Sequence, residues 1–395
     1  MACAPAFQPN LAPRRRALAA EFLCCAFLIL SAVSSAQTES ENWTRCEGQN
    51  PDLSIQACTL LLQSAGQDDE NLAVALNNRG IAYDIKDQHD MAIADFTRAI
   101  QLKPDYAGAF SNRATAHAAR GELDFAILDF NQAIQLKPDD ASAFNLRGSA
   151  YEAMGQLDLA IADFTHAIQL KPDYADAFSN RGNVYADQHQ FSSAIDDYTE
   201  ALRLNPSDAA TLFDRGAAYL VTGRSDPAIA DFDHAIRLRP NFPEAFNNRG
   251  IARHNQGDEL QAIADFDQAV RLQPGYAAAY GNRCASHSMA GSLQAALDDC
   301  NHALALHADD PSALDSRGLV YLRMKNPAAA LADYNAALAL NPGKASSLYG
   351  RGIARQILGD TAANADLAAA KAIQPGIAEQ FSRWGITPSP EPGKP

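Results

Sequence analysis

The feature that most restricts how this chain can fold is a sequence repeat with a fixed period of 34 residues. Prolines follow this period at Pro104, Pro138, Pro172, Pro206, Pro240, Pro274 and, after one omission, Pro342. Arginines follow it at Arg79, Arg113, Arg147, Arg181, Arg215, Arg249, Arg283, Arg317 and Arg351. We therefore expect nine stacked supersecondary units starting at Ala73, each covering the apolar face of its neighbour.

Each repeat is predicted to contain two amphipathic helices, with Ala73 taken as position 1 of the first repeat. Leu76, Gly80 and Tyr83 share one helical face, and Ala92, Phe96, Ala99 and Ile100 share another. Position 15 is glycine in six repeats, where a left-handed residue can end the first helix. Proline at position 32 ends the second helix. The order is therefore helix, turn, helix, stop.

Small and aromatic residues at fixed positions predict how the helices pack. Glycine is frequent at position 8 and alanine at position 20, which predicts that the two helices cross closely there. Position 24 is aromatic, at Phe96, Phe130, Phe164, Tyr198, Phe232 and Phe266, and is expected to fill the space between one hairpin and the next. The composition, 47% apolar but only 8% aromatic, also suits alanine-rich helices.

This set of positions resembles the tetratricopeptide repeat over residues 73–377. Arginine at position 7 departs from the leucine that is usual in that family. The resemblance implies an all-α fold, a right-handed superhelical solenoid of antiparallel helix-turn-helix repeats. It also implies a concave groove, lined by the first helices, that holds a protein or an extended peptide without any cofactor.

The flanking segments predict export and capping. Residues 1–36 combine Arg14 to Arg16, an apolar run and Ser34 to Ala36, which is typical of a cleavable signal peptide; retention as an anchor is the alternative. Removal of this segment, which has three arginines and one glutamate, would change the formal net charge from −15 to −17, which disfavours nucleic acid. We expect an exported protein, periplasmic in a Gram-negative host. Residues 37–72 are predicted to be a degenerate cap, and 378–395 a capping helix with a proline-rich tail.

Four cysteines follow the predicted signal peptide, and an even number in an exported chain favours disulfides. Cys46 and Cys58 fall at positions 8 and 20 of a degenerate repeat. Facing Cα atoms of packed helices there would be about 3.5 to 5.5 Å apart, which allows a bridge. Cys284 and Cys300 fall at positions 8 and 24, about 6 Å from an ideal facing pair, so their bridge requires adjustment. Two buried free thiols are the alternative for that pair.

Charged residues also follow the repeat. Aspartate occupies position 23 at Asp95, Asp129, Asp163, Asp197, Asp231, Asp265, Asp299 and Asp333. Ion pairs with the nine arginines, within a repeat or between neighbouring repeats, are expected, since opposite charges at a fixed spacing in a solenoid meet on adjacent helices. A basic ladder for an anionic ligand would require unpaired arginines, and the net charge argues against it.

Asparagine precedes the arginine in five repeats, at Asn78, Asn112, Asn180, Asn248 and Asn282. Position 6 can face the groove in tetratricopeptide repeats, and the pattern is similar to the asparagine ladder of O-linked N-acetylglucosamine transferases, which grips a peptide backbone. An amide can donate and accept at once, which suits that task. The alternative is an asparagine that is simply tolerated at an exposed position.

No metal or catalytic constellation is predicted. His166, His234 and His302 share position 26 of alternate repeats, roughly 20 Å apart, which is too far for one metal.

The leading hypothesis is a non-enzymatic periplasmic scaffold that binds a protein or peptide in cell-envelope complexes. The alternative is a regulatory subunit that binds anionic polysaccharide or lipid headgroups beside an envelope enzyme. An enzyme with an unrecognised site is a third hypothesis.

Overall fold

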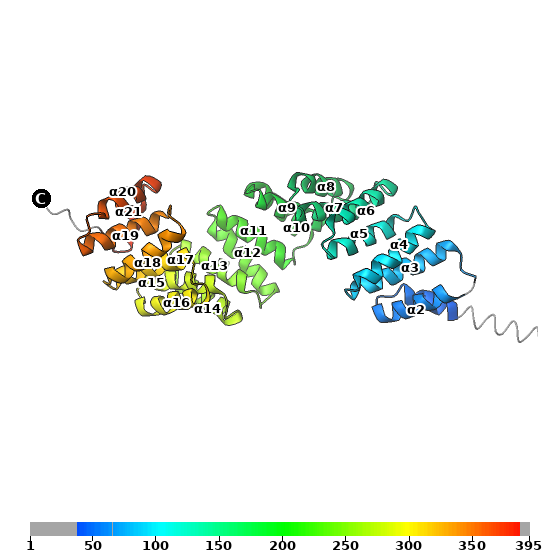
Figure 1. The fold of residues 1–395 in the computed structure, drawn as a ribbon, viewed down its shortest axis with the longest axis horizontal. Helices are drawn as coiled ribbons and strands as arrows, with labels where there is room; N and C mark the ends of the chain where they lie inside the picture. The colour runs from blue at the N-terminus through cyan, green and yellow to red at the C-terminus, as the bar shows by residue number, and fades with distance from the viewer. Residues whose placement is uncertain (1–37, 65, 388–395) are drawn as a thin grey trace, which may run out of the picture. The chain divides into compact units, whose positions relative to one another are not determined.

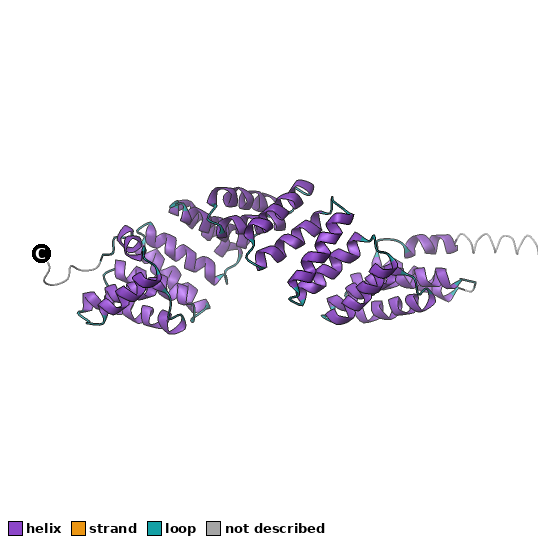
Figure 2. Ribbon diagram, turned by 90° about the horizontal axis from the view of Figure 1, so that it is seen from above, coloured by secondary structure: helices purple, strands orange, loops and turns teal. Residues whose placement is uncertain are grey.

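The computed structural model describes residues 38–64 and 66–387, and this part of the chain is helical without strands (Figure 2). The predicted all-α fold of stacked helical hairpins is therefore confirmed. The predicted signal peptide lies outside the described residues, as does most of the proline-rich tail. The contacts divide the chain into two compact units, one that ends at Asp173 and one that begins at Tyr174.

The first unit contains a capping pair and three repeats, whose helices are labelled in Figure 1. Residues 38–46 form a helix. The following helices are α2 (Pro51–Gln63), α3 (Asp69–Ile85), α4 (His89–Leu102), α5 (Ala107–Ala119), α6 (Leu123–Leu136), α7 (Ala141–Ala153) and α8 (Leu157–Leu170). The helix α3 begins four residues before the predicted repeat boundary, because Asp68 caps it by accepting a hydrogen bond from the Asn71 amide.

The second unit contains six repeats and a final helix, which are labelled in Figure 1. Its helices are α9 (Ala175–Asp187), α10 (Phe191–Leu204), α11 (Ala209–Val221), α12 (Ser225–Leu238), α13 (Pro243–Asn255), α14 (Glu259–Leu272), α15 (Ala277–Met289), α16 (Leu293–Leu306), α17 (Pro311–Arg323), α18 (Pro327–Leu340), α19 (Ala345–Leu358), α20 (Ala363–Ile373) and α21 (Ile377–Arg383). The capping helix α21 thus begins one residue earlier than predicted.

Every hairpin turn has a left-handed residue at position 15. Six of these are the predicted glycines, Gly121, Gly155, Gly223, Gly257, Gly291 and Gly359. The other three are Asp87, His189 and Lys325, with φ of 57°, 59° and 59°. Tertiary packing therefore imposes the same turn even where a side chain makes a positive φ sterically unfavourable.

The two helices of a repeat touch through the small residue at position 8. A Cβ atom added to Gly80 would lie 2.6 Å from the ring of Phe96 at position 24, and one added to Gly148 would lie 2.7 Å from the ring of Phe164. The same rings also contact the next repeat, since Phe96 clusters with Ala116. The aromatic ring therefore packs between one hairpin and the next, as predicted, and it also packs between the two helices of its own hairpin.

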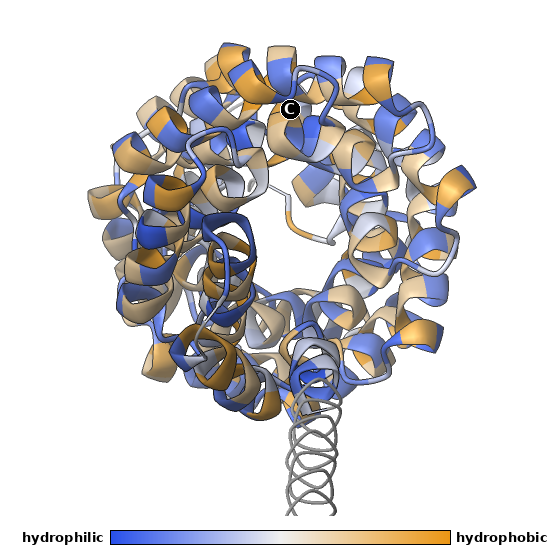
Figure 3. Cartoon of the chain, turned by 90° about the vertical axis from the view of Figure 1, so that its right-hand side faces the viewer, coloured by the Kyte–Doolittle hydropathy of each residue, from blue (hydrophilic) through white to orange (hydrophobic). Residues whose placement is uncertain are grey.

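The first and second helices of a repeat differ in how they contact the neighbouring repeat. Each first helix touches the next first helix within a unit: α3, α5 and α7 in the first, and α9, α11, α13, α15, α17 and α19 in the second. No such contact joins consecutive second helices of the described repeats. Hydrophilic and hydrophobic residues are interspersed along the helices (Figure 3). The first helices therefore form a continuous layer in each unit.

Candidate functional site

The arginine at position 7 pairs with the aspartate at position 23 of its own repeat. The pairs are Arg79–Asp95, Arg113–Asp129, Arg147–Asp163, Arg181–Asp197, Arg215–Asp231, Arg249–Asp265, Arg283–Asp299, Arg317–Asp333 and, with one residue fewer between the partners, Arg351–Asp366. The geometry is bidentate: Arg147 Nε and Nη2 each lie 2.7 Å from an oxygen of Asp163. The predicted ion pairing therefore lies within each repeat.

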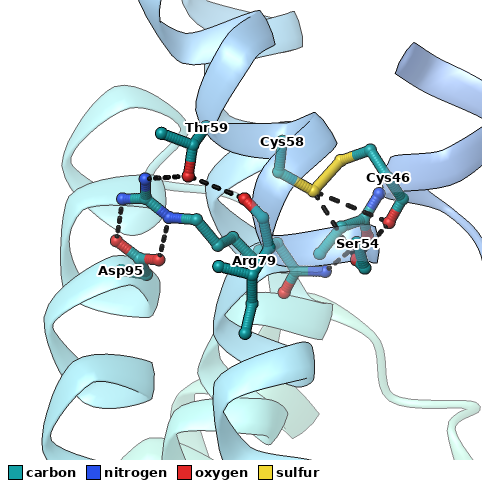
Figure 4. The surroundings of a disulfide bond; sticks show 9 residues. Cys46, Ser54, Cys58, Thr59, Arg79 and Asp95 are labelled. Carbon is teal, nitrogen blue, oxygen red and sulfur yellow. Dashed lines mark hydrogen bonds and ion pairs between the residues drawn. A yellow bond between two sulfur atoms is a disulfide. The ribbon is translucent and has the colours of Figure 1, made fainter. Parts of the chain in front are cut away.

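The same arginine also reaches back to the preceding repeat. Its Nη1 donates to the side chain at position 25, for example from Arg113 to Thr97 Oγ1 at 3.0 Å and from Arg317 to Asn301 Oδ1 at 2.9 Å. In the cap, Arg79 Nη1 donates to Thr59 Oγ1 at 3.1 Å (Figure 4). One guanidinium thus joins three helices, which explains why arginine replaces the leucine usual at this position.

Aromatic rings further enclose these guanidinium groups. The Arg147 carbon Cζ lies 5.4 Å from the ring centre of Phe144 and 5.8 Å from that of Tyr151. Hydrogen bonding to Asp163 raises the pKa of Arg147, so its charge is permanent. A neutralised, partly buried row of arginines has no excess charge to offer to an anionic ligand.

The predicted asparagines at position 6 are half-buried on the first helices. Asn112 Nδ2 donates to Asn77 Oδ1 of the preceding repeat at 2.9 Å, and Asn282 Nδ2 donates to Asn247 Oδ1 at 2.9 Å. Asn247 in turn donates to Asn248 Oδ1 at 3.2 Å. The amides therefore form short chains across adjacent first helices.

The buried members of these chains, Asn77 and Asn247 at position 5, were not among the predicted site residues. The indication of them in the sequence is that each directly precedes a predicted asparagine, since Asn77 is followed by Asn78 and Asn247 by Asn248. One N–H of Asn112 is donated to Asn77, and no described residue donates a hydrogen bond to the Asn112 carbonyl oxygen. Such an amide is oriented by the protein and keeps acceptor capacity for a ligand.

Positions 6, 9 and 13 lie about one turn apart, so they share one face of each first helix. We call this face the first-helix surface. In the first repeat it consists of Asn78, Ile81 and Ile85, which line one shallow cavity of about 90 Å³ next to the N-terminal cap. Ile85 is 62% exposed. A polar amide and exposed aliphatic side chains thus lie together on this surface.

The four predicted cysteines are bonded in two pairs. Cys46 and Cys58 join the two capping helices, with their Cα atoms 4.9 Å apart (Figure 4). Cys284 and Cys300 join α15 to α16, with their Cα atoms 5.4 Å apart. The displacement of about 6 Å along the helix axis predicted for Cys284 and Cys300 is wrong. The residue at position 8 lies between positions 20 and 24, which are one helical turn apart, so either of them can be bridged to it.

The histidines at position 26 do not converge. His166 packs against Phe144 and His302 against Tyr280, with tilted rings whose centres are 4.2 Å apart in both pairs. Within residues 38–64 and 66–387, no group of three histidine, cysteine or acidic side chains could hold a metal ion. In the same part of the chain, no helix has the length and apolar character needed to cross a bilayer.

A stack of helical hairpins with this spacing defines a helical-repeat protein. Models of the tetratricopeptide repeat match residues 73–106, 175–208, 213–277 and 311–344, and a further TPR repeat model matches 116–155 and 148–189. The chain belongs to the tetratricopeptide repeat family. No curated protein sequence matches it.

Solved structures with the same kind of repeat are similar to this chain. The Cut9–Hcn1 hetero-tetramer of APC/C matches with a TM-score of 0.51 and 20% identity, over 78% of this chain and 60% of that one. The chain thus spans less than two thirds of that neighbour. A tetratricopeptide repeat protein from Parabacteroides merdae matches with a TM-score of 0.49 and 18% identity, over 67% and 98% of the two chains. YrrB, described as having an unusual peptide-binding site, matches with a TM-score of 0.42 and 25% identity, over 47% and 95%.

Proposed function

We propose that this tetratricopeptide repeat scaffold is exported and binds an extended peptide segment of a partner protein along its first-helix surface, without catalysis. The observations that carry the proposal are the layer of first helices within each unit, the chains of oriented asparagine amides on these layers, and the exposed aliphatic residues beside Asn78 in the first repeat. Amides can satisfy the N–H and C=O groups of a peptide backbone, while aliphatic side chains remove apolar groups of the peptide from water. We further propose that this layer is the floor of a concave groove and that the partner belongs to the cell envelope.

The alternative, an anionic polysaccharide or lipid headgroup bound by the arginines, has less support. All nine arginines at position 7 have a bidentate or otherwise close aspartate partner. Binding of an anion there would have to break these pairs and leave a buried aspartate unpaired. A peptide bound through amides requires no such rearrangement.

The binding test replaces Asn112, Asn180 and Asn248 together by alanine. Crosslinking pull-down from the native envelope should lose the partner that the unaltered protein captures, while the helical circular dichroism stays unchanged. The melting temperature should fall modestly, because Asn112 no longer donates to the buried Asn77. A matched control replaces the exposed Asn71, Asn205 and Asn241 and should capture normally. Equal capture by both triple variants would contradict the proposal.

Export is tested separately by expressing the full chain and fractionating the host cells. The proposal predicts a periplasmic protein whose first residue is Gln37, as read from the N-terminal peptide by mass spectrometry. Recovery of an uncleaved chain from the cytoplasm would contradict export but would leave the peptide-binding proposal in place.

A further inference from the structure

An open pocket of about 410 Å³ lies at the C-terminal end of the second unit. Its apolar lining comes from the start of α16, the end of α17, α19 and the segment after α21: Leu293, Leu322, Ile353, Ile357, Trp384 and Ile386. Leu322, Ile353 and Ile386 are buried, whereas Ile357 is 54% exposed. The volume falls within the range of small ligand sites, and the exposed isoleucine shows that the floor is not fully covered by the protein itself.

The wall of this pocket is held in place by tight packing. Gly385 adopts a φ of 75° and reverses the chain after α21, so that the Ile386 amide donates to the Phe381 carbonyl at 3.0 Å. The ring of Trp384 lies 5.0 Å from that of Phe381, which lies 4.8 Å from Tyr349 on α19. A half-buried tryptophan fixed in this way is a suitable anchor for a partner side chain.

Two cations border the pocket, Arg323 and Lys325. Arg323 Nη1 donates to the carbonyl oxygen of Ser288 and lies 3.3 Å from its Oγ. Among the described residues, no carboxylate is within ion-pair distance of Arg323 or Lys325. This contrasts with the paired arginines at position 7, and it occurs in a chain with a formal net charge of −15.

From this combination we infer that the pocket binds an acidic peptide segment of a partner protein in which a bulky apolar residue is flanked by carboxylates. The apolar side chain enters the floor between Ile357 and Trp384, and the flanking carboxylates pair with Arg323 and Lys325. The inference deepens the proposed function, on which it rests, because Ile353 and Ile357 occupy positions 9 and 13 of the last first helix. The negative charge of the remaining chain would keep acidic segments from binding elsewhere.

The test uses the full chain with the substitution Trp43→Phe, which leaves Trp384 as the only tryptophan. The probe is the blocked peptide Asp-Glu-Leu-Phe-Glu-Asp. Two comparison peptides replace either the acidic residues by their amides or Leu-Phe by Gly-Ser. Only the first peptide should give a saturable change in Trp384 fluorescence at low concentration, and higher salt should weaken its binding.

The charge contribution is measured with Arg323→Gln and Lys325→Gln combined, and with Lys325→Gln alone, which changes an exposed side chain. The double variant should bind the acidic peptide about tenfold more weakly. A control with the same loss of charge replaces the exposed Arg237 and Arg271 by glutamine and should bind normally.

Three results would overturn the inference: no saturable signal, equal weakening by both double variants, or preferential binding of the uncharged peptide. Saturable binding of dodecanoate without binding of the acidic peptide would also overturn it, in favour of a lipid. If the asparagine triple variant still loses its partner while the pocket fails these tests, the proposed function stands and only the pocket is refuted.

Discussion

Cys284 and Cys300 in the seventh repeat occupy the two positions at which Gly80 and Phe96 pack in the first repeat. A covalent bond thus replaces the contact between a small residue and a ring. The Cα atoms of the bonded cysteines are 5.4 Å apart, so the hairpin of α15 and α16 does not have to open to form it. The seventh repeat is therefore held together without the aromatic residue that its neighbours use.

The bonded cysteines predict that residues 37–395 contain no free thiol. Alkylation of the protein isolated without reductant should leave Cys46, Cys58, Cys284 and Cys300 unlabelled, and intact mass spectrometry measures this directly. Alkylation after denaturation in a thiol reductant should label all four and serves as the control. Complete labelling of the unreduced, denatured protein would refute both bridges.

Replacing Cys284 and Cys300 by alanine should lower the free energy of unfolding by about 2 to 4 kcal/mol, as loss of a bridge with this separation usually does. The pair Cys284→Gly with Cys300→Phe should recover part of that loss, because it restores the contact seen between Gly80 and Phe96. Denaturant unfolding of the full chain measures both variants. Equal stability of the alanine variant and the unaltered protein would show that the bridge contributes nothing.

The substitution Arg147→Leu should destabilise the protein by about 3 kcal/mol, because it leaves the buried carboxylate of Asp163 without a partner. Replacing both residues by leucine should cost less than replacing Arg147 alone, since no unpaired charge remains.

The exposed pair Arg203 and Glu200 is the control for that experiment. Loss of this ion pair should change the free energy of unfolding by less than about 1 kcal/mol. If Arg147→Leu is as mild as Arg203→Gln, the buried pair is not a significant source of stability.

The substitution His189→Gly should stabilise the protein by about 0.5 to 1 kcal/mol, because His189 has a φ of 59° in the turn between α9 and α10. Gly155→Ala at the same position of the third repeat should destabilise it by a similar amount, since φ is 71° there. Urea unfolding compares the two variants. We expect a higher free energy of unfolding for His189→Gly and a lower one for Gly155→Ala. A loss of stability from His189→Gly would contradict the argument.

Asp214 predicts a pH dependence of stability. Burial, with a smaller contribution from Asp208, raises the pKa of Asp214 from 3.8 to about 6. The folded protein therefore keeps a proton that the unfolded chain loses between these two values. Stability falls as the pH rises through this window and remains lower above it.

The substitution Asp214→Asn removes the pH-dependent loss of stability. It also introduces the asparagine that five other repeats have at position 6. The variant should be more stable than the unaltered protein by about 1 to 2 kcal/mol at pH 7.5, after allowance for residual exposure, and nearly equal to it at pH 4. Urea unfolding at both pH values measures the difference. An equal effect at both would assign the gain to packing and not to the carboxyl group.

Much of the fold could be predicted because its determinants are local and repeated. Glycine at position 15 and proline at position 32 act on the backbone within a few residues, so the ends of the helices follow from the sequence. An ion pair between Arg147 and an aspartate could also be expected from their constant spacing. The pairing of Cys284 with Cys300 could be proposed, but its geometry was misjudged, because the axial offset of two crossing helices is a property of packing.

The sequence by itself determined the class of fold, the number of repeats and the residue types that form ion pairs, since these depend on patterns that recur at a short, fixed spacing. Only the tertiary structure decided that each arginine pairs inside its own repeat. It also decided that Asn112 bonds to Asn77 of the preceding repeat, and that Leu322, Ile357 and Trp384 surround one pocket. Those contacts join residues on different helices, where crossing geometry and side-chain packing place each group, and a repeating pattern does not encode either of them.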